Sequence, residues 1–362
     1  MDIGIPKERQ TGEQRVGLTP AGVGLLTKDG HTCYVESGAG EAAGFNDYDY
    51  ERLGGTIVFE GEEVYARASL ILKVLRPTLE EIAWTREGQT IMSFWELMAA
   101  PREELEQLVA QKVTAVAYEM VSADGKDFPI HKTMSEVAGR MAPYIAGSML
   151  MRSQGGRGVL LNGVPGVPAG DVVILGGGTL GRNAARAFLG LGAKVFVLCP
   201  TLEHLRYIDE HFKGHVTTMI SHDFNIAHLV RFADVLIGAV RVPGERPPVL
   251  ITRDMLPTMR PGAVILDFAI DHGGCVETSR PTTLESPSFV EEGIVHYCVP
   301  NVPGAVPRTS THAFNNAAWP FVQTVVKAGP ATAFAQEAAL KNAVVLRHGT
   351  VVDETLESIL RA

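Results

Sequence analysis

A glycine-rich turn near the middle of the chain has the residue types and spacing of a phosphate-binding motif. The apolar run Val172–Leu175 is followed by Gly176-x-Gly178-x-x-Gly181 and then by a helical pattern. The first glycine allows a tight turn, the second lets the backbone approach a pyrophosphate, and the third lets the helix pack closely on the strand. The helix N-terminus directs its unpaired N–H groups and positive dipole end at the phosphates. The motif predicts a dinucleotide site, and a glycine turn in an ordinary α/β domain is the alternative.

The strand after this helix lacks the acidic residue that usually selects NAD. That residue binds the ribose hydroxyls about 20 residues after the glycines. Here the strand pattern 194–198 ends at Cys199, whose thiol cannot accept both hydroxyl hydrogen bonds. No arginine follows directly to bind a 2′-phosphate, although His204 and Arg206 lie one turn further on. NAD, NADP and a degraded cofactor pocket therefore all stay open.

Composition limits the functional classes. A chain of 362 residues predicts about two or three domains, and 46% apolar with 20% charged residues is typical of globular proteins. The net charge of −9 argues against binding to nucleic acid or to anionic membranes. No apolar run reaches the roughly 18 residues of a membrane span. The N-terminus lacks the apolar core of a signal peptide, and the four cysteines form no metal-binding pattern. We expect a cytoplasmic protein without a metal site.

Alternating strand and helix patterns indicate two α/β units. The first starts at Asp2, and the second, with the glycine turn, covers about 171–300. A helical stretch follows over 311–340, and the end, 343–346 and 351–360, is too short for a core of its own. The patterns predict two doubly wound Rossmann-like domains with a cleft between them, and the end of the chain is expected to return to the first domain. Small ligands bind at the carboxyl ends of the strands in such domains.

Several stretches resemble alanine dehydrogenase, of the group that also includes nicotinamide nucleotide transhydrogenase. They are 4–8, 15–23, 134–140, 155–160, 163–167, 269–283 and 296–311. The similarity is nearly collinear over the chain. It implies a two-domain hydride-transfer enzyme that binds NAD, with NADP as the alternative, in its middle domain. That domain would cover 129–306, and 1–128 with 307–362 would form the substrate domain. It also implies a homohexamer and a small-molecule amino-acid or oxo-acid substrate.

The resemblance implies roles for particular residues. Arg15 would hold the substrate carboxylate, Asp271 would lie beside the nicotinamide and take part in catalysis, and Asn301 would lie near the substrate. A surface salt bridge for Arg15 and a turn cap for Asp271 are the alternatives. The implied cofactor-binding residues are Ser135, Gly176, Gly178, Thr179, Leu180, Gly181, Cys199, His204, Ser221, Val240 and Asp271.

Two positions depart from the family pattern. Alanine dehydrogenases carry Lys-Val-Lys-Glu-Pro where this chain reads Lys73-Val74-Leu75-Arg76-Pro77. The second lysine of that motif holds the substrate, and Leu75 takes its place in the expected substrate site. Glu96 takes the place of a histidine that serves as the acid–base partner.

Three interpretations of Glu96 stay open. It could bind a cationic group such as a substrate amine, or act as a general acid–base if its pKa rises in an apolar cleft. Alternatively it only pairs with Arg76 or Arg15 and fills the lost site. We expect Arg76 not to replace the missing lysine, because neighbouring residues of a strand face opposite sides.

Four further residues have competing explanations. His272 either tunes the protonation of Asp271 or makes a supporting hydrogen bond. Arg241 either contacts a phosphate or is only exposed to solvent. His296 and His312 have no metal-like spacing and are interpreted as structural.

These observations favour an NAD(P)-dependent oxidoreductase acting on the C–N bond of an amino acid, an imine, or a 2-oxo acid plus an amine, other than alanine and pyruvate. A non-redox lyase or cyclodeaminase that recycles its bound dinucleotide is one alternative. A catalytically silent binding or regulatory homologue is another. Transhydrogenation is disfavoured, because 279–283 and 303–307 resemble the dehydrogenase branch.

Overall fold

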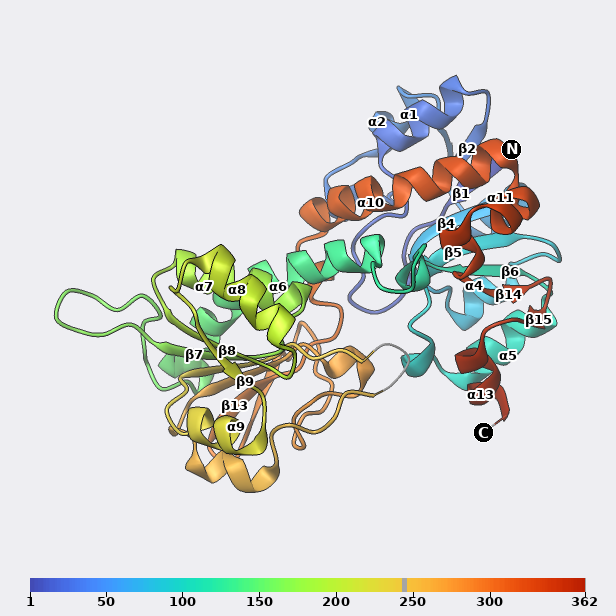
Figure 1. Ribbon diagram of the computed structural model, residues 1–362. Coiled ribbons are helices and arrows are strands. Elements are labelled where there is room, and N and C mark those ends of the chain that lie inside the picture. Colours follow the sequence, from blue (N-terminus) through green and yellow to red (C-terminus); the bar gives the residue numbers. More distant parts are fainter. Residues whose placement is uncertain (243–245, 362) are drawn as a thin grey trace. The chain divides into compact units, whose positions relative to one another are not determined.

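The computed structural model describes residues 1–242 and 246–361 (Figure 1). The chain divides into two compact units, unit 1 with Met1–Met134 and Pro303–Ala362, and unit 2 with Ser135–Val302. The sequence-based division after residues 128 and 306 therefore differs by six residues (134 against 128) and by four (302 against 306). Among the described residues, no helix has the length and apolar character needed to cross a membrane.

Unit 1 is built on a mostly parallel sheet. Its order, over the residues that the structure describes, is β15-β14-β6-β5-β4-β1-β2-β3. Pairing is parallel from β6 to β3, and β14 and β15 add antiparallel strands at one edge. The strands are β1 (Asp2–Ile5), β2 (Thr32–Glu36), β3 (Thr56–Val58), β4 (Leu70–Leu75), β5 (Thr90–Phe94), β6 (Thr114–Ala117), β14 (Val344–Arg347) and β15 (Thr350–Val351). The strand order reverses between β1 and β4, which makes this the switch point where ligands bind in doubly wound sheets.

The central strands of unit 1 are apolar because helices cover both faces of the sheet. Every residue of β4 and of β5 is buried, as parallel strands between two helical layers require. The helices are α1 (Pro20–Lys28), α2 (Asp47–Glu51), α3 (Gly61–Arg67), α4 (Leu79–Ala83), α5 (Arg102–Ala110), α10 (Pro307–Ala328), α11 (Pro330–Gln336), α12 (Ala338–Lys341) and α13 (Glu354–Arg361).

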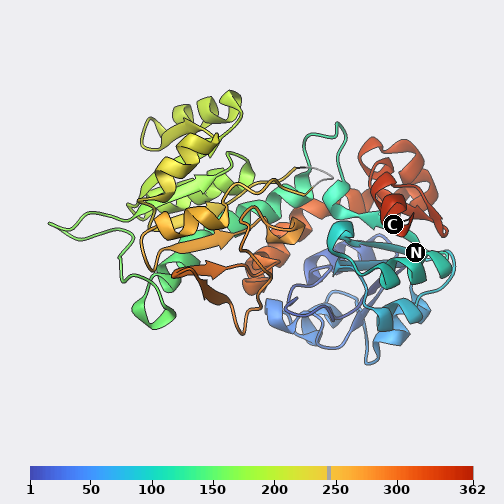
Figure 2. The same cartoon turned by 90° about the horizontal axis from the view of Figure 1, so that it is seen from below.

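Unit 2 repeats the same arrangement. Its sheet has the order β12-β13-β11-β10-β7-β8-β9 in the described residues, with β12 as the antiparallel strand and the switch point between β7 and β10. The strands are β7 (Asp171–Leu175), β8 (Lys194–Cys199), β9 (Thr217–Ile220), β10 (Val235–Gly238), β11 (Val264–Asp267), β12 (Ser288–Glu291) and β13 (Ile294–Tyr297). The helices are α6 (Pro129–Met149), which begins in unit 1, α7 (Thr179–Gly190), α8 (Leu202–Phe212) and α9 (Asp223–Val230). Figure 2 shows these helices around the sheet.

The apolar residues of β7 serve two cores by simple alternation. Val172 and Ile174 pack with residues of α6, α7 and α8. Val173 and Leu175 pack with residues of α9 on the other face. Because side chains alternate along a strand, one uninterrupted apolar run fills both layers. The predicted α/β class with two doubly wound domains is confirmed.

The expectation of one helical stretch over 311–340 is wrong. The structure has α10, α11 and α12 there, with breaks at Gly329, whose φ is 78°, and at Glu337, whose backbone is extended. Pro330 contributes to the first break because it has no N–H to continue the helix. The final helix begins at Glu354 rather than at Val351, which belongs to β15.

Candidate functional site

The glycine turn of unit 2 leaves a helix N-terminus open. Gly176 has a φ of 112°, and a Cβ added there would lie 2.3 Å from the carbonyl oxygen of Ala239. A Cβ on Gly181 would lie 2.0 Å from the carbonyl oxygen of Gly176. Around Gly178, by contrast, an added Cβ would have no described atom within 4 Å apart from its own neighbours in the chain, and this residue caps α7 without a side-chain hydrogen bond. The turn thus fits a pyrophosphate, which would bind the free N–H groups of the first helical turn.

The other expected cofactor residues lie around this turn, mostly at the carboxyl ends of neighbouring strands. Thr179 and Leu180 lie in the first turn of α7, and Ser135 lies in α6. Cys199 ends β8, Ser221 follows β9, and Val240 lies in the loop after β10. His204 lies in α8. The Cys199 sulfur lies 3.6 Å from Nδ1 of His204. The α6 helix approaches α7 at Gly139, where an added Cβ would lie 2.5 Å from the Leu180 carbonyl oxygen. Their contacts with a dinucleotide stay a prediction.

Asp271 and Asn301 lie after adjacent strands of unit 2. Asp271 is in the short 3₁₀ helix Ile270–His272 beyond β11, and Asn301 follows β13. The backbone N–H of Asn301, whose φ is 52°, donates to Oδ1 of Asp271 over 3.0 Å. This hydrogen bond orients the carboxylate.

A buried aspartate, which the sequence analysis did not single out, shapes the loop that carries Asp271. Asp267 ends β11 and is 1% exposed. Its carboxylate accepts the N–H groups of Ala269 (3.1 Å), Cys275 (3.0 Å) and Val276 (3.3 Å). Burial raises the pKa of Asp267, and these hydrogen bonds oppose the rise. An acidic residue that ends an apolar strand is the sequence signal that could have predicted it.

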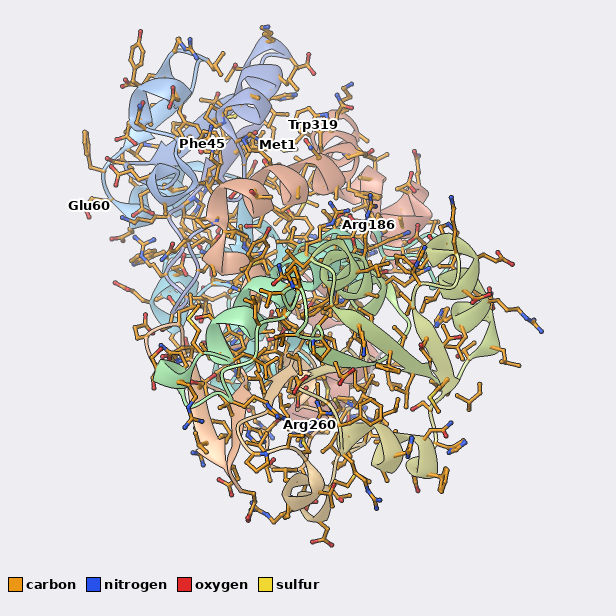
Figure 3. The ribbon with its side chains drawn as sticks, turned by 90° about the vertical axis from the view of Figure 1, so that its left-hand side faces the viewer. Met1, Phe45, Glu60, Arg186, Arg260 and Trp319 are labelled. Carbon is orange, nitrogen blue, oxygen red and sulfur yellow. The ribbon has the colours of Figure 1, made fainter. Side chains whose placement is uncertain are left out.

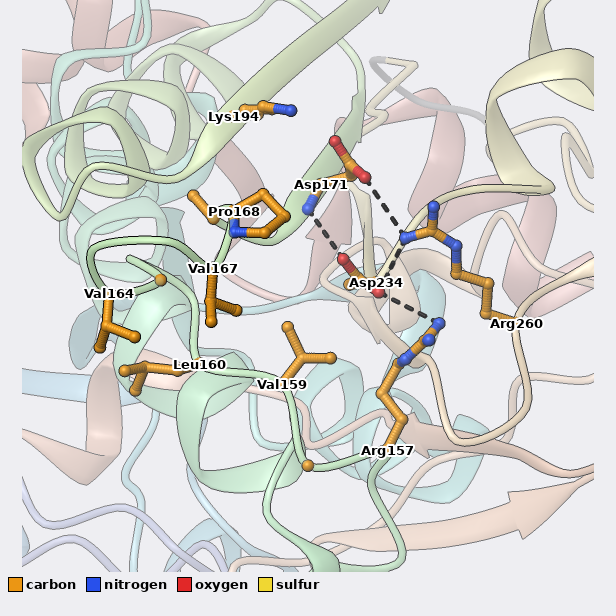
Figure 4. Close-up of a pocket in the computed structure, with 13 residues that line it drawn as sticks. Arg157, Val159, Leu160, Val164, Val167, Pro168, Asp171, Lys194, Asp234 and Arg260 are labelled. Atoms are coloured by element: carbon orange, nitrogen blue, oxygen red, sulfur yellow. Dashed lines mark hydrogen bonds and ion pairs between the residues drawn. The ribbon is translucent and has the colours of Figure 1, made fainter.

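A pocket of about 400 Å³ lies at the opposite edge of the unit 2 sheet (Figure 4). Its polar wall includes Asp171 and Lys194, which begin β7 and β8, and Asp234, which precedes β10. Arg260 pairs with Asp171 (3.3 Å) and Asp234 (3.1 Å), and Arg157 also pairs with Asp234 (3.1 Å). This pocket is therefore distinct from the glycine turn.

Arg15 of unit 1 belongs to a buried ion pair. Its Nε donates to Glu13 over 2.8 Å and its NH2 over 2.5 Å, while NH1 lies 3.0 Å from the sulfur of Met134. Arg15 is 2% exposed, so the alternative of a surface salt bridge is wrong. Gly17 allows the close approach of this segment to β4, because an added Cβ would lie 2.1 Å from the Leu72 carbonyl oxygen.

Lys73, a residue of β4, is buried between the carboxylates of two other segments. Its Nζ lies 2.7 Å from Glu81 and 3.2 Å from Glu8. Glu8 also accepts the N–H of Val74 over 2.6 Å. Burial raises the pKa of Glu8 to about 7, although Lys73 opposes the rise. A lysine inside the apolar run of β4 is the sequence signal for this cluster.

Leu75 and Arg76 lie where β4 ends. Leu75 is the last strand residue and is 6% exposed. Arg76 donates from Nε to Glu104 over 2.8 Å, and its NH1 lies 3.6 Å from Glu96. The pairing of Glu96 with Arg76 is thus present in the structure. Strand alternation ends at Leu75, so it does not determine which side Arg76 faces.

The backbone of Glu96 is held in a left-handed conformation. Its φ is 47°, and its N–H donates to Oε1 of Glu119 over 2.7 Å, while the N–H of Trp95 donates to the same carboxylate. Burial raises the pKa of Glu96, against the effects of Arg76 and Arg15. Burial likewise raises the pKa of Glu119 to about 7. Strained residues of this kind are frequent at functional sites.

The histidines have structural partners or lie away from metal-like groupings. His296 bonds Thr278 over 2.8 Å and the Ile294 carbonyl over 3.0 Å. His312 packs edge-on against Phe45, labelled in Figure 3, with ring centroids 5.3 Å apart. Burial, with the charge of Arg241, lowers the pKa of His272. Within residues 1–242 and 246–361, no group of three His, Cys, Asp or Glu side chains could hold a metal ion.

Comparison with known proteins identifies the family. The model "Alanine dehydrogenase/PNT, N-terminal domain" matches residues 4–138, and the C-terminal domain model of the same family matches residues 142–354. The chain belongs to the alanine dehydrogenase/PNT family. It is 42% identical to the alanine dehydrogenase of Mycolicibacterium smegmatis, over 98% of this chain and 96% of that protein. It is 44% identical to that of Bacillus subtilis, over 98% and 94%.

Solved structures agree with this family membership. A structure of L-alanine dehydrogenase matches with a TM-score of 0.95 and 41% identity, covering 100% of this chain and 99% of that chain. A transhydrogenase from Sinorhizobium meliloti matches with a TM-score of 0.82, 98% and 99% coverage and 23% identity, which shows the shared fold. The expected family and oxidoreductase class are confirmed.

Proposed function

We propose that this member of the alanine dehydrogenase/PNT family is a dinucleotide-dependent oxidoreductase that acts on the C–N bond of an amino acid, an imine, or a 2-oxo acid plus an amine. The observation that carries the proposal is the uncapped N-terminus of α7 at Gly178, beside two glycines that admit no side chain. Because the chain also belongs to a family of dehydrogenases, this anion site is best explained by a nicotinamide dinucleotide. When bound, the dinucleotide would accept or donate the hydride.

The residues of this chain would bind the substrate and move the proton. Arg15 presents a planar guanidinium suited to a carboxylate, and its bonds to Glu13 fix its orientation. Asp271, oriented by the N–H of Asn301, would accept or donate a proton at the reacting nitrogen. These roles rest on the family resemblance together with the geometry within each unit.

We further propose that alanine and pyruvate are not the preferred substrate pair. The family pattern places a lysine and a histidine where this chain has Leu75 and Glu96. Leu75 cannot bind a carboxylate, and Glu96 is paired with Arg76 rather than presenting an imidazole for proton transfer. Because relatives of this chain are alanine dehydrogenases, alanine is nevertheless the first substrate to assay.

NAD is the proposed cofactor, with NADP as the competing choice. The end of β8 offers the Cys199 thiol, which lies against Gly177 and 3.6 Å from Nδ1 of His204, in place of a carboxylate. This arrangement removes the group that usually binds both ribose hydroxyls but adds no arginine for a 2′-phosphate. We also propose a cytoplasmic homohexamer on family resemblance, which sedimentation of the purified protein would test.

Absorbance of the reduced nicotinamide tests the proposed function directly. The purified chain would be assayed with NAD and a panel of amino acids, and with NADH and 2-oxo acids with or without amines. Turnover with a substrate other than alanine or pyruvate supports the proposal, whereas comparable turnover with alanine and NAD contradicts the substrate assignment. Tightly bound dinucleotide with substrate consumption but no absorbance change would favour the lyase. No dinucleotide binding by calorimetry would favour the silent homologue.

A further inference from the structure

Arg76 is a buried cation with unused hydrogen-bonding capacity. The residue is 9% exposed, and its Nε is fixed by Glu104 at 2.8 Å. In the described part of the chain, its terminal nitrogens make no hydrogen bond, since the only other partner is Glu96 at 3.6 Å. A guanidinium anchored through Nε keeps its two terminal nitrogens available for a planar oxyanion.

The place of Arg76 in the fold is that of a ligand-binding residue. It follows β4 directly, at the carboxyl edge beside the switch point of the unit 1 sheet. Doubly wound sheets bind their ligands at this edge. The neighbouring Leu75 is apolar, so Arg76 supplies the positive charge that Leu75 cannot.

We propose that Arg76 binds the carboxylate of the substrate alongside Arg15, and that Glu96 occupies the Arg76 guanidinium until that carboxylate arrives. This inference names a binding residue within the proposed function and rests on it. Glu96 suits the second role because its carboxylate makes no hydrogen bond within the described residues and holds Arg76 only at 3.6 Å. A substrate carboxylate placed in bidentate contact would displace this weaker pair.

Displacement of Glu96 from Arg76 is linked to protonation of the Glu96 carboxylate. Glu96 is faced by Arg76 from the end of β4, by Arg15 and Glu13 from the segment after β1, and by Glu119 from the end of β6. When a second carboxylate shares Arg76, the ionised form of Glu96 loses part of its stabilisation, and like charges favour protonation. Binding of the substrate carboxylate therefore favours the protonated form of Glu96 and is accompanied by proton uptake.

Titration calorimetry of the dinucleotide-saturated protein with oxamate and with 2-oxobutyrate tests the proposal without requiring turnover. Arg76→Met is expected to weaken binding about 10- to 100-fold, as loss of hydrogen bonds to a charged group does. Arg76→Lys should recover part of the affinity, because it restores charge without the planar fork. Arg102→Met is the matched control, since Arg102 pairs with Glu106 on the exposed face of α5.

Glu96→Gln separates the proposed exchange from a merely structural pair. We expect tighter binding of the anions, by up to about tenfold, and loss of proton uptake measured in buffers of different ionisation enthalpy. Wild-type-like binding by Arg76→Met, or no binding of either anion by the wild type, overturns the inference. Carboxylate binding that depends on Arg76 without any redox turnover would leave the inference intact and contradict the proposed function.

Discussion

The two units share one strand order but carry different chemistry at equivalent places. In each unit, three parallel strands lie on one side of the switch point and three on the other. The order is β3-β2-β1-β4-β5-β6 in unit 1 and β9-β8-β7-β10-β11-β13 in unit 2. The switch point of unit 2 carries a glycine turn and an open helix N-terminus. The switch point of unit 1 carries Arg15, Lys73 and Arg76 among carboxylates. The same scaffold therefore presents backbone N–H groups at the switch point of one unit and charged side chains at that of the other.

This difference predicts which kind of substitution should damage the site in each unit. In unit 2 the site depends on the absence of side chains, so added atoms should destroy it. In unit 1 the site depends on buried charges that balance one another, so the removal of one charge should leave its partners uncompensated. Substitutions at the two sites should therefore differ in what they damage.

The largest expected effect is on the stability of unit 1. Lys73→Met should lower the free energy of unfolding by about 3–5 kcal/mol, because removing one partner leaves buried charge uncompensated. Lys73 is fully buried between Glu8 and Glu81. Urea denaturation followed by circular dichroism measures the change.

The matched variant in unit 2 is Arg260→Met. Arg260 also bridges two carboxylates, Asp171 and Asp234, but its side chain is 36% exposed. Solvent screens such pairs, so we expect a loss of at most about 1 kcal/mol. Equal losses in the two variants would contradict the claim that buried charge distinguishes unit 1.

The next effect is on dinucleotide binding by unit 2. Gly181→Ala places a Cβ 2.0 Å from the carbonyl oxygen of Gly176 and forces the turn to shift. We expect NADH affinity, measured by calorimetry, to fall about 100-fold or more, since a close helix–strand approach is needed there. Gly190→Ala, at the open end of the same helix, is the control and should bind as the wild type. Unchanged affinity of Gly181→Ala would remove the glycine turn from the cofactor site.

Much of unit 2 could be predicted from the sequence because its signals are local. The run Val172–Leu175, the three glycines and the helix that follows lie within one short segment, and the structure forms β7, the turn and α7 there. Counting along the chain likewise identifies Cys199 as the residue where an acidic side chain usually ends the second strand.

The charge arrangement of unit 1 could not be predicted in the same way, because its partners are distant in sequence. Arg76 meets Glu104, and the carboxylate that holds the Glu96 backbone comes from Glu119. The alternation rule does not apply at Arg76, because β4 ends one residue earlier. Strand ends, where ligands bind, are the places where periodicity stops being informative.

The third prediction concerns pH. The pKa of Glu8 is about 7 in the folded chain and ordinarily 4.5, so the folded state keeps a proton that the unfolded chain loses between these values. Stability should therefore fall as pH rises through this window, by on the order of 3 kcal/mol for Glu8 alone. Thermal unfolding between pH 5 and about 8 measures the slope. Glu8→Gln should reduce it, and an unchanged slope in that variant would assign the effect to other carboxyl groups such as Glu119.

The smallest expected effect is on recognition of the cofactor ribose by unit 2. Cys199→Asp restores a carboxylate at the end of β8, where it would accept both ribose hydroxyl hydrogen bonds and repel a 2′-phosphate. We expect the ratio of NAD to NADP affinity to rise about tenfold, which corresponds to one charged hydrogen bond. Cys199→Ser keeps the size and neutrality of the thiol and should leave the ratio unchanged. If both variants behave alike, the ribose hydroxyls are not recognised at the end of β8.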